Sequence, residues 1–344
     1  MNFRRKYNKK RLGYDIINNP FKKKNKKYFG KSSQKSFCFY TNIIKIFMKI
    51  FLFILLICIC YTFRFKQKKL KIAICSMAKH ENLYIKEFIE YYEKLGINNI
   101  YLYDDNDNGT ERIKDVVPKS KKIRVKVFEN IKERIKMQSD AFTECYNNNK
   151  KKFDWFLMID IDEYLVIKNN TIRGYLSSPI FNKCDFIKIH WTLPTDNNLV
   201  FYDNRTLIER FSGPYRECHH IKSIIRGNID GLKYWIHSPY VSPYRNVTCN
   251  NVGEVQNYTD LNFQSIMKYN IDKAYIMHFQ FKSTEEYVNK FRRGYSNWNW
   301  VRPKVKDWIF NYFKNNDITK EKIEYLEKEF NISLKKYRKI IKID

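Results

Sequence analysis

The stretch that decides the fold is DWFLMIDIDEYL, residues 154–165. Its five apolar residues, 155–159, have the pattern of a strand that is buried on both faces in the middle of a sheet. Asp160 and Asp162 follow directly, and the two-residue repeat of a strand places them on the same side of the chain. Two carboxylates so close repel each other unless a proton or a cation lies between them. The stretch therefore predicts a central strand that ends in a cation-binding acidic pair.

The residues upstream of this stretch alternate between strand patterns and helix patterns. Strands alternating with helices predict a parallel sheet, and ligands of such sheets bind at the carboxyl ends of the strands. We therefore expect an α/β fold whose site lies at the edge that carries Asp160 and Asp162. Gly96 and Pro118 supply stop signals for two of the helices. The expected strands are 71–77, 99–105, 123–128 and, within the stretch quoted above, 155–162, and the expected helices are 82–95, 110–117 and 134–147.

The acidic pair has the ligand types that a hard divalent cation prefers. Mg²⁺ or Mn²⁺ is commonly held by one or two carboxylates together with substrate phosphates. The alternative is a strand end whose aspartates are simply solvated. A second alternative is a phosphohydrolase, because an apolar strand followed by D-x-D also opens haloacid-dehalogenase-type phosphatases. Those enzymes have Thr or Val two residues beyond the second Asp, where this chain has Tyr164.

The two ends of the chain differ in composition from its middle. Fifteen Lys and Arg residues lie within residues 1–49, where Asp15 is the one acid, and they supply part of the formal net charge of +29. The predicted parts are a basic, flexible cytoplasmic tail (1–42), a transmembrane signal-anchor (43–64), a catalytic domain (65–310) and a helical extension (311–344). This order predicts a single-pass type II membrane protein whose catalytic domain faces the lumen of the Golgi or the endoplasmic reticulum. The high charge alone favours a non-catalytic protein that binds polyanions or membrane surfaces.

Cysteines and sequons are compatible with a lumenal domain. Five of the 8 Cys residues fall in the predicted catalytic domain, which allows two disulfides at most, and the sequence does not assign their pairing. None of them has the spacing of a zinc site. Six N-x-S/T sequons permit glycosylation, at Asn108, Asn169, Asn204, Asn246, Asn257 and Asn331.

Several longer motifs occur in one order along the chain. They are residues 78–110, which end in YLYDDNDNGT, Gln138 with Cys145, 154–165, 189–197 with 208–211, KSIIRG (222–227) and AYIMHFQFKSTEEYVNKFRRG (274–294). In these motifs and their order the chain resembles glycosyltransferases of family 92, which have the GT-A fold and are related to family 2. The likeness covers about residues 71–294.

The resemblance implies a donor and a set of roles. It implies a metal-dependent enzyme that moves a hexose from a nucleotide sugar to a glycan acceptor. The donor that it favours is a UDP-sugar, with UDP-galactose first. Asp160 would face the ribose or a metal-bound water, and Asp162 and His278 would ligate Mn²⁺ or Mg²⁺. Lys282, Arg292 and Arg293 would neutralise the leaving diphosphate. The nucleoside would lie against Ser76, Glu81, Asp104, Asp105 and Asp107.

Transfer with inversion also needs a carboxylate that removes the proton of the acceptor hydroxyl. Asp196, in the loop after Trp191, and Glu209 are the candidates, with Glu217 third. Glu209 has a structural alternative as the partner of Arg210 or Arg205. Trp191 could stack on a sugar ring. The sequence does not define the donor sugar, the acceptor or the linkage, because a few loop contacts decide them.

Overall fold

The computed structural model describes residues 45–56, 69–127, 137–235, 237–241, 246–256, 268–294 and 304–342. The chain divides into two compact units, residues 1–68 and residues 69–344. In the first unit, the described residues 45–56 form a helix whose side chains are all exposed. The predicted basic tail, 1–42, lies outside the described residues. The second unit contains all the elements that follow.

The predicted membrane anchor, 43–64, is described only over residues 45–56. A helix needs about 20 residues to cross the hydrocarbon core of a bilayer. Within the described residues, no helix combines the length and the apolar character that a membrane span requires. This finding contradicts the prediction of a single-pass type II membrane protein with a lumen-facing domain, and that prediction is withdrawn.

The second unit is built on one mixed sheet. Among the described residues, ten strands form this sheet in the order β11-β10-β6-β7-β4-β1-β2-β3, with β12 paired to both β5 and β6. A separate hairpin consists of β8 (Leu232–Trp235) and β9 (Ser238–Val241). The strands of the large sheet are β1 (Ile72–Ala78), β2 (Asn99–Asp104), β3 (Ile123–Val127), β4 (Trp155–Met158), β5 (Glu163–Ile167), β6 (Phe186–Pro194), β7 (Tyr215–Arg226), β10 (Thr248–Asn250), β11 (Val255–Gln256) and β12 (Ala274–His278).

Most pairings in the sheet are parallel. Strands β3, β2, β1 and β4 run parallel to one another, and β6 runs parallel to β10 and β12. Strand β7 is antiparallel to both β4 and β6 and joins the two halves. The predicted α/β class with a mostly parallel sheet is therefore confirmed. Because β1, β2 and β4 are parallel, their carboxyl ends meet at one edge of the sheet.

Helices cover both faces of the sheet, and the alternation along β1 shows why. Ile72 and Ile74 pack in the same cluster as Phe88 of α2 (Asn82–Leu95), whereas Ala73 packs in the cluster that contains Phe142 of α4 (Met137–Asn149). Successive side chains of a strand point to opposite faces, so a strand that is apolar throughout needs cover on both. Shorter helices are α3 (Ile113–Val116), α5 (Ile172–Leu176) and α6 (Leu207–Arg210).

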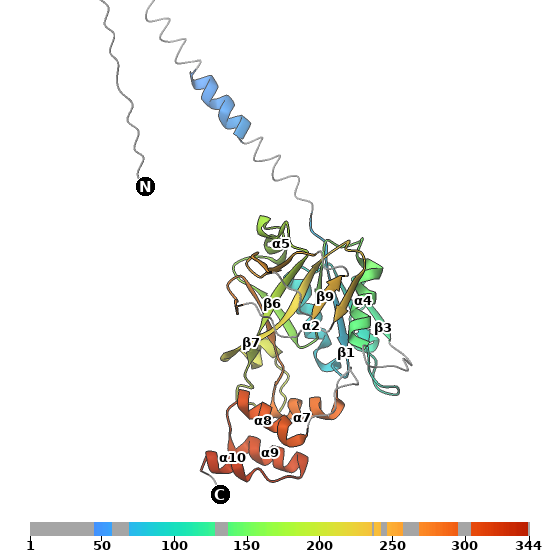
Figure 1. Ribbon diagram of the computed structural model, residues 1–344, viewed down its shortest axis with the longest axis vertical. Helices are drawn as coiled ribbons and strands as arrows, with labels where there is room; N and C mark the ends of the chain where they lie inside the picture. Colours follow the sequence, from blue (N-terminus) through green and yellow to red (C-terminus); the bar gives the residue numbers. More distant parts are fainter. Residues whose placement is uncertain are drawn as a thin grey trace, which may run out of the picture. The chain divides into compact units, whose positions relative to one another are not determined.

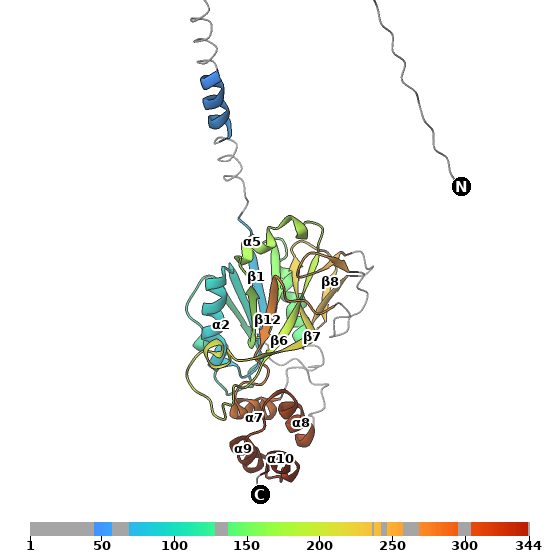
Figure 2. The same cartoon turned by 90° about the vertical axis from the view of Figure 1, so that its left-hand side faces the viewer.

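The C-terminal helices gather beyond one end of the sheet, as both views show (Figures 1 and 2). They are α7 (Thr284–Arg293), α8 (Val305–Asn315), α9 (Lys320–Phe330) and α10 (Lys335–Ile340). Stacked rings tie α7 to α8, with Tyr287 4.4 Å from Trp308 and 4.7 Å from Tyr312 between ring centroids. Helix α8 runs across residue 310, where the sequence analysis placed a boundary, and α7 to α10 belong to the same compact unit as the sheet.

Two disulfides join parts of the second unit that are distant in sequence. Cys75 of β1 pairs with Cys145 of α4, and Cys184 pairs with Cys249 of β10, at sequence separations of 70 and 65 residues. Closing loops of this length stabilises a fold by about 4 kcal/mol each in the chain-entropy description. Of the cysteines in the described residues, Cys218 is the free thiol.

Candidate functional site

A cavity of about 490 Å³ opens at the carboxyl edge of the sheet. Its walls come from the segments that follow β1 and β4, from β6, β7 and β12, and from α7 and α8. The walls carry three acidic side chains, Glu81, Asp160 and Asp162, together with basic and imidazole groups. Residues from distant segments of the chain therefore converge where the sequence predicted a ligand site.

Asp160 and Asp162 reach the cavity by a turn rather than by the alternation of a strand. Strand β4 ends at Met158, and the amide of Glu163 donates to the carbonyl of Asp160 at 3.2 Å. Between the two acids, Ile161 is buried in the core. The pair thus lies at the cavity as predicted, although the geometry that places it there is a turn into β5.

Asp162 lies among three groups that favour its ionised form. Lys290 Nζ is 2.9 Å from Oδ2, His278 Nε2 is 3.6 Å from Oδ1, and Lys282 Nζ is 4.0 Å from Oδ2. Burial opposes ionisation, but Lys290 and His278 hold the pKa of Asp162 well below its ordinary value. Asp162 is therefore a carboxylate at neutral pH, with nitrogen groups on both oxygens.

Asp160 has different partners. Gln138 donates to its Oδ1, and Lys222 Nζ donates to its Oδ2 at 2.8 Å. Lys222 is fully buried on β7, where it also lies 3.6 Å from Glu163 Oε1. Burial raises the pKa of Glu163 well above its ordinary value, more than Lys222 lowers it. The Lys222 ammonium is therefore directed mainly at Asp160.

His278, at the end of β12, is a neutral imidazole beside Asp162. Its burial lowers the pKa of the ring despite the nearby Asp162 carboxylate, so the imidazole is neutral at pH 7. No residue that the structure describes makes a hydrogen bond to its buried Nδ1. Asp162 and His278 thus bring an oxygen and a nitrogen donor together, which fits Mn²⁺ or Mg²⁺ with phosphate and water as further ligands. In the described part of the chain, no group of three or more His, Cys, Asp or Glu side chains converges on one point.

Glu81 holds two of the basic side chains that the sequence assigned to the diphosphate. Arg293 donates to Oε1, and Lys282 Nζ lies 3.3 Å from Oε2. Burial opposes the charge of Glu81, but Arg293 and Lys282 keep its pKa below the ordinary value. Arg292 instead pairs with Glu329 of α9 at 2.7 Å and does not line the cavity.

The other residues that were predicted to bind the nucleoside do not line the cavity. Ser76 is buried within β1, and Asp104 accepts hydrogen bonds from the amides of Asn106 and Ile113 at 2.9 Å. Asp105 is buried 3.9 Å from Lys79, and Asp107 is 2.8 Å from a ring nitrogen of His80. Among the described residues that line the cavity, none of these four acids and hydroxyls appears. Their contact with a nucleoside stays a prediction.

The three candidates for the catalytic base do not line the cavity either. Asp196 is buried between Tyr312 and Lys322, at 2.5 Å and 2.6 Å from their polar atoms. Glu209 accepts a hydrogen bond from the amide of Thr206 at 2.9 Å and completes the capping box of α6. Glu217 is exposed on β7.

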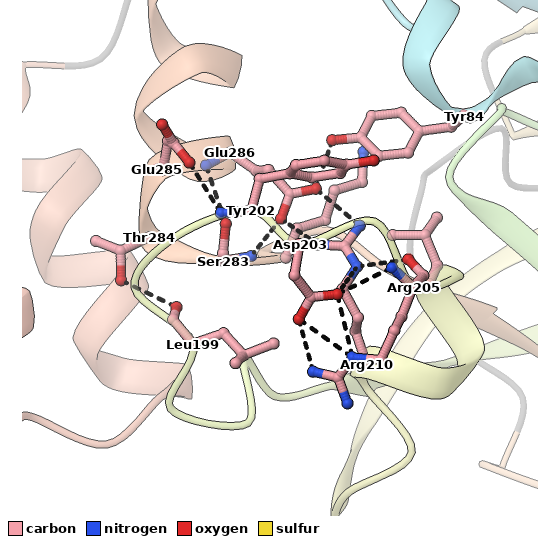
Figure 3. Close-up of polar contacts among 12 residues, drawn as sticks. Tyr84, Leu199, Tyr202, Asp203, Arg205, Arg210, Ser283, Thr284, Glu285 and Glu286 are labelled. Atoms are coloured by element: carbon pink, nitrogen blue, oxygen red, sulfur yellow. Dashed lines mark hydrogen bonds and ion pairs between the residues drawn. The ribbon is translucent and has the colours of Figure 1, made fainter.

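A buried ion pair supports the start of α7 (Figure 3). Arg210 donates to both oxygens of Glu286, at 2.6 Å and 3.0 Å, and the Tyr84 hydroxyl donates to Glu286 Oε1 at 2.5 Å. The amide of Ser283 donates to Glu286 Oε2 at 3.0 Å. We call these four residues the Glu286 cluster. It fixes the first turn of α7, the helix that carries Lys290 and Arg293 to the cavity.

Sequence reasoning missed Lys222, Lys290 and the Glu286 cluster. Lys222 lies 62 residues from Asp160, and Arg210 lies 76 residues from Glu286, so no local pattern connects them. Lys290 carried a usable signal, because it lies three residues before Arg293 and therefore on the same face of the helix.

A second hollow of about 670 Å³ lies between α9 and α10 and is wide open to solvent. Its lining includes Arg338, whose partner Glu327 is 2.6 Å away. No histidine and no pair of acids is among its lining residues that the structure describes. The first cavity, although smaller, is therefore the candidate site.

Fold and site together define an α/β protein with an acidic and basic cavity at the carboxyl edge of a mostly parallel sheet, the class that includes phosphate-binding enzymes. The sequence profile of glycosyltransferase family 92 matches residues 68–334, which is more than half of the chain. The chain therefore belongs to glycosyltransferase family 92. The predicted family and the predicted class of glycosyltransferase are confirmed.

Curated relatives agree with this family. A glycosyltransferase family 92 protein of Oryza sativa subsp. japonica is 26% identical over 114 residues, which are 31% of this chain and 19% of that protein. Family 92 proteins of Ricinus communis and Arabidopsis thaliana are each 23% identical, over 27% and 30% of this chain and 16% and 18% of their own length. The matched part of this chain thus spans about a fifth or less of each relative.

Proposed function

We propose that the chain is a metal-dependent glycosyltransferase with a GT-A fold, which transfers a hexose from a nucleotide sugar to a glycan acceptor with inversion. The donor we expect is a UDP-sugar, with UDP-galactose as the first candidate. The observation that carries the proposal is the ionised Asp162 beside neutral His278 in the cavity of a family 92 chain. Lys290 and Arg293 line the same cavity.

The chain's own groups suit a sugar diphosphate. Asp162 and His278 would hold Mn²⁺ or Mg²⁺, which supplies positive charge for the leaving diphosphate. Lys290 and Arg293 reach the cavity from one face of α7 and can bind phosphate oxygens, because charged nitrogen donors stabilise oxyanions strongly. Lys222 and Gln138 orient the Asp160 carboxylate. The acceptor base, for which Asp196 and Glu209 were predicted, stays a prediction.

The alternatives gain no support from the cavity. In a D-x-D phosphohydrolase the first Asp is the nucleophile and Thr or Val follows two residues beyond the second Asp, where this chain has the buried Tyr164. A polyanion-binding surface explains the basic charge but not a buried carboxylate with a neutral imidazole 3.6 Å away.

The test is a screen of the purified full chain against UDP-sugars and GDP-sugars, with Mn²⁺ and with a chelator. We expect Mn²⁺-dependent turnover of one donor, and a loss of turnover by at least about 100-fold for Asp162→Ala, the size typical of losing one group that stabilises transition-state charge. Arg292→Ala is the matched control, because this cation on α7 does not line the cavity. Equal Mn²⁺-dependent turnover by Asp162→Ala would refute the assignment.

A further inference from the structure

One wall of the cavity is built from an indole and two imidazoles. The Trp191 ring stacks on His220, at 5.2 Å between centroids and an angle of 16°, and meets His237 edge-on at 5.1 Å. All three line the cavity, together with Leu193. We call Trp191, His220 and His237 the aromatic wall. It comes from β6, β7 and the turn between β8 and β9, whereas Lys290 and Arg293 come from α7.

The indole N–H of Trp191 indicates that a ligand binds beside it. Trp191 is 6% exposed, and no residue in the described part of the chain accepts a hydrogen bond from its buried Nε1. A buried indole N–H nearly always has a partner, and leaving such a donor unpaired costs about 1–3 kcal/mol. Because Trp191 lines the cavity, an acceptor atom on a bound molecule can supply this partner.

The imidazoles of the wall carry no charge at neutral pH. Burial lowers the pKa of both, and His278 and Lys222 add to the effect at His220 and His237 respectively. His237 Nδ1 lies 3.1 Å from the carbonyl oxygen of Ile221, so Nδ1 carries the proton and Nε2 is an acceptor. An apolar surface with one N–H donor and neutral acceptors matches the carbon–hydrogen faces and hydroxyls of a sugar.

The polar face of α8 lines the same cavity. Asn311, Lys314 and Asn315 follow the spacing that puts side chains on one face of a helix, and Trp308 and Tyr312 of the same helix are buried. Each acid of the cavity already has a cation, namely Lys222 for Asp160, Lys290 for Asp162 and Arg293 for Glu81. Lys314 pairs with no acidic side chain that the structure describes, so it is a surplus positive charge at the cavity.

We propose that the aromatic wall and the polar face of α8 form the acceptor-saccharide subsite, and that this subsite takes a saccharide with an acidic substituent that pairs with Lys314. The inference rests on the proposed function. It adds the class of acceptor, an anionic saccharide, and names Lys314 as the residue that selects it.

The experiment measures binding of matched saccharides to the full chain in the presence of UDP and Mn²⁺. The probes are a disaccharide that contains a uronic acid, its carboxyl-reduced neutral counterpart, and the sulfated form of the neutral one. We expect at least one acidic probe to bind at least about tenfold more tightly than the neutral probe, with a difference that shrinks at high salt. Lys314→Gln should remove the preference, and Lys314→Arg should retain it. Lys306→Gln, an exposed lysine of α8 outside the cavity lining, is the control.

A second variant tests the wall. Trp191→Phe keeps an aromatic ring but loses the N–H, and we expect it to weaken acidic and neutral probes by the same several-fold factor. Its melting temperature shows whether it folds, and UDP binding shows whether the donor side is intact. Unchanged binding of both probes by this variant would contradict the role of the indole.

The outcomes separate the inference from the function on which it rests. If the wild type binds UDP but does not prefer an acidic probe, the anionic acceptor is refuted and the glycosyltransferase stands. If Lys314→Gln weakens UDP as much as the acidic probe, Lys314 belongs to the donor diphosphate and the inference is again refuted. If the wild type binds neither UDP nor any other nucleotide in the donor screen, the proposed function itself fails.

Discussion

Two buried clusters of charge include residues of α7, namely Glu286 in one and Lys290 in the other, and they differ in how completely their polar atoms are paired. In the Glu286 cluster, each carboxylate oxygen accepts two hydrogen bonds (Figure 3). At Asp162, by contrast, Oδ1 lies 3.6 Å from His278 Nε2, and Nδ1 of that imidazole has no hydrogen bond from a described residue. Both carboxylates are ionised, because cations lower the pKa of each.

The difference teaches how to tell a structural ion pair from a candidate site. A buried charge costs free energy unless its hydrogen bonds are complete. The Glu286 cluster meets this condition with protein atoms alone, so it needs no ligand. Asp162 and His278 meet this condition only in part. Both residues line the cavity, so a ligand can supply the missing hydrogen bonds.

The largest expected effect is the loss of stability when the Glu286 cluster is disrupted. Arg210→Met leaves the Glu286 carboxylate buried without its main cation, which typically costs 3–5 kcal/mol, so we expect the free energy of unfolding to fall by about 4 kcal/mol. Urea denaturation measures it. Arg205→Met is the control, because Arg205 pairs with Asp203 at the surface, where such pairs contribute about 0–1 kcal/mol. Equal losses in the two variants would contradict the structural role of the cluster.

Substitution of Asp162 should lower activity more than stability. Asp162→Asn is expected to lower kcat/KM by at least about 100-fold, or about 2.7 kcal/mol of transition-state stabilisation. It should lower the free energy of unfolding less than Arg210→Met does. Lys290 loses its carboxylate partner in this variant, but water can reach its ammonium through the cavity. Steady-state kinetics and urea denaturation on the same preparations measure both quantities. A loss of stability equal to that of Arg210→Met would remove the distinction between the clusters.

The pH dependence of stability sharpens the comparison further. Burial opposes the charge of Glu286, but Arg210, Ser283 and Tyr84 keep its pKa below the ordinary value of 4.5. The unfolded chain therefore binds more protons than the folded one below about pH 4.5, and this stabilisation is lost as the pH falls through the folded pKa. We expect the stability difference between the wild type and Glu286→Gln to shrink on acidification. A difference that grows towards low pH would show that the sign is wrong.

The smallest expected effect concerns Glu209, which was predicted as a catalytic base. Its side chain completes a capping box at the surface, so Glu209→Ala should cost about 0.5–1 kcal/mol of stability and leave turnover nearly unchanged. A thermal melt and a turnover assay decide this. If turnover instead fell by about two orders of magnitude, the size expected for a lost general base, the predicted role would be supported and α6 would have to move to the cavity.

Local patterns predicted the elements well where periodicity was strong. The expected helix 82–95 matches α2, which ends at Leu95 and is capped by Gly96 with φ of 103°, a backbone angle that glycine adopts without strain. The first expected strand, 71–77, differs from β1 by one residue at each end. The strand expected through residue 162 is shorter, because β4 ends at Met158 and a turn follows. The pattern could not distinguish a strand from a turn that also presents Asp160 and Asp162 on one side.

Residues that act on the acidic pair could not be predicted in the same way. Lys222 reaches Asp160 only because β7 inserts antiparallel beside β4, and Lys290 reaches Asp162 only because α7 docks at the end of the sheet. The residues near Asp160 and Asp162 do not indicate either pairing, since the partners are 62 and 128 residues away. The same distance explains why Asp196 and Glu209 were equally acceptable as candidates.

The sequence by itself determined the α/β class, the family and the acidic edge, because these depend on the period of apolar residues and on motifs that are short in sequence. Only the tertiary structure decided which charges meet. It placed Lys290, His278 and Asp162 together, kept Asp196 and Glu209 out of the cavity lining, and brought Lys314 and the aromatic wall to the same cavity. The physical reason is that electrostatic partners are chosen by distance in space, whereas a sequence records distance along the chain.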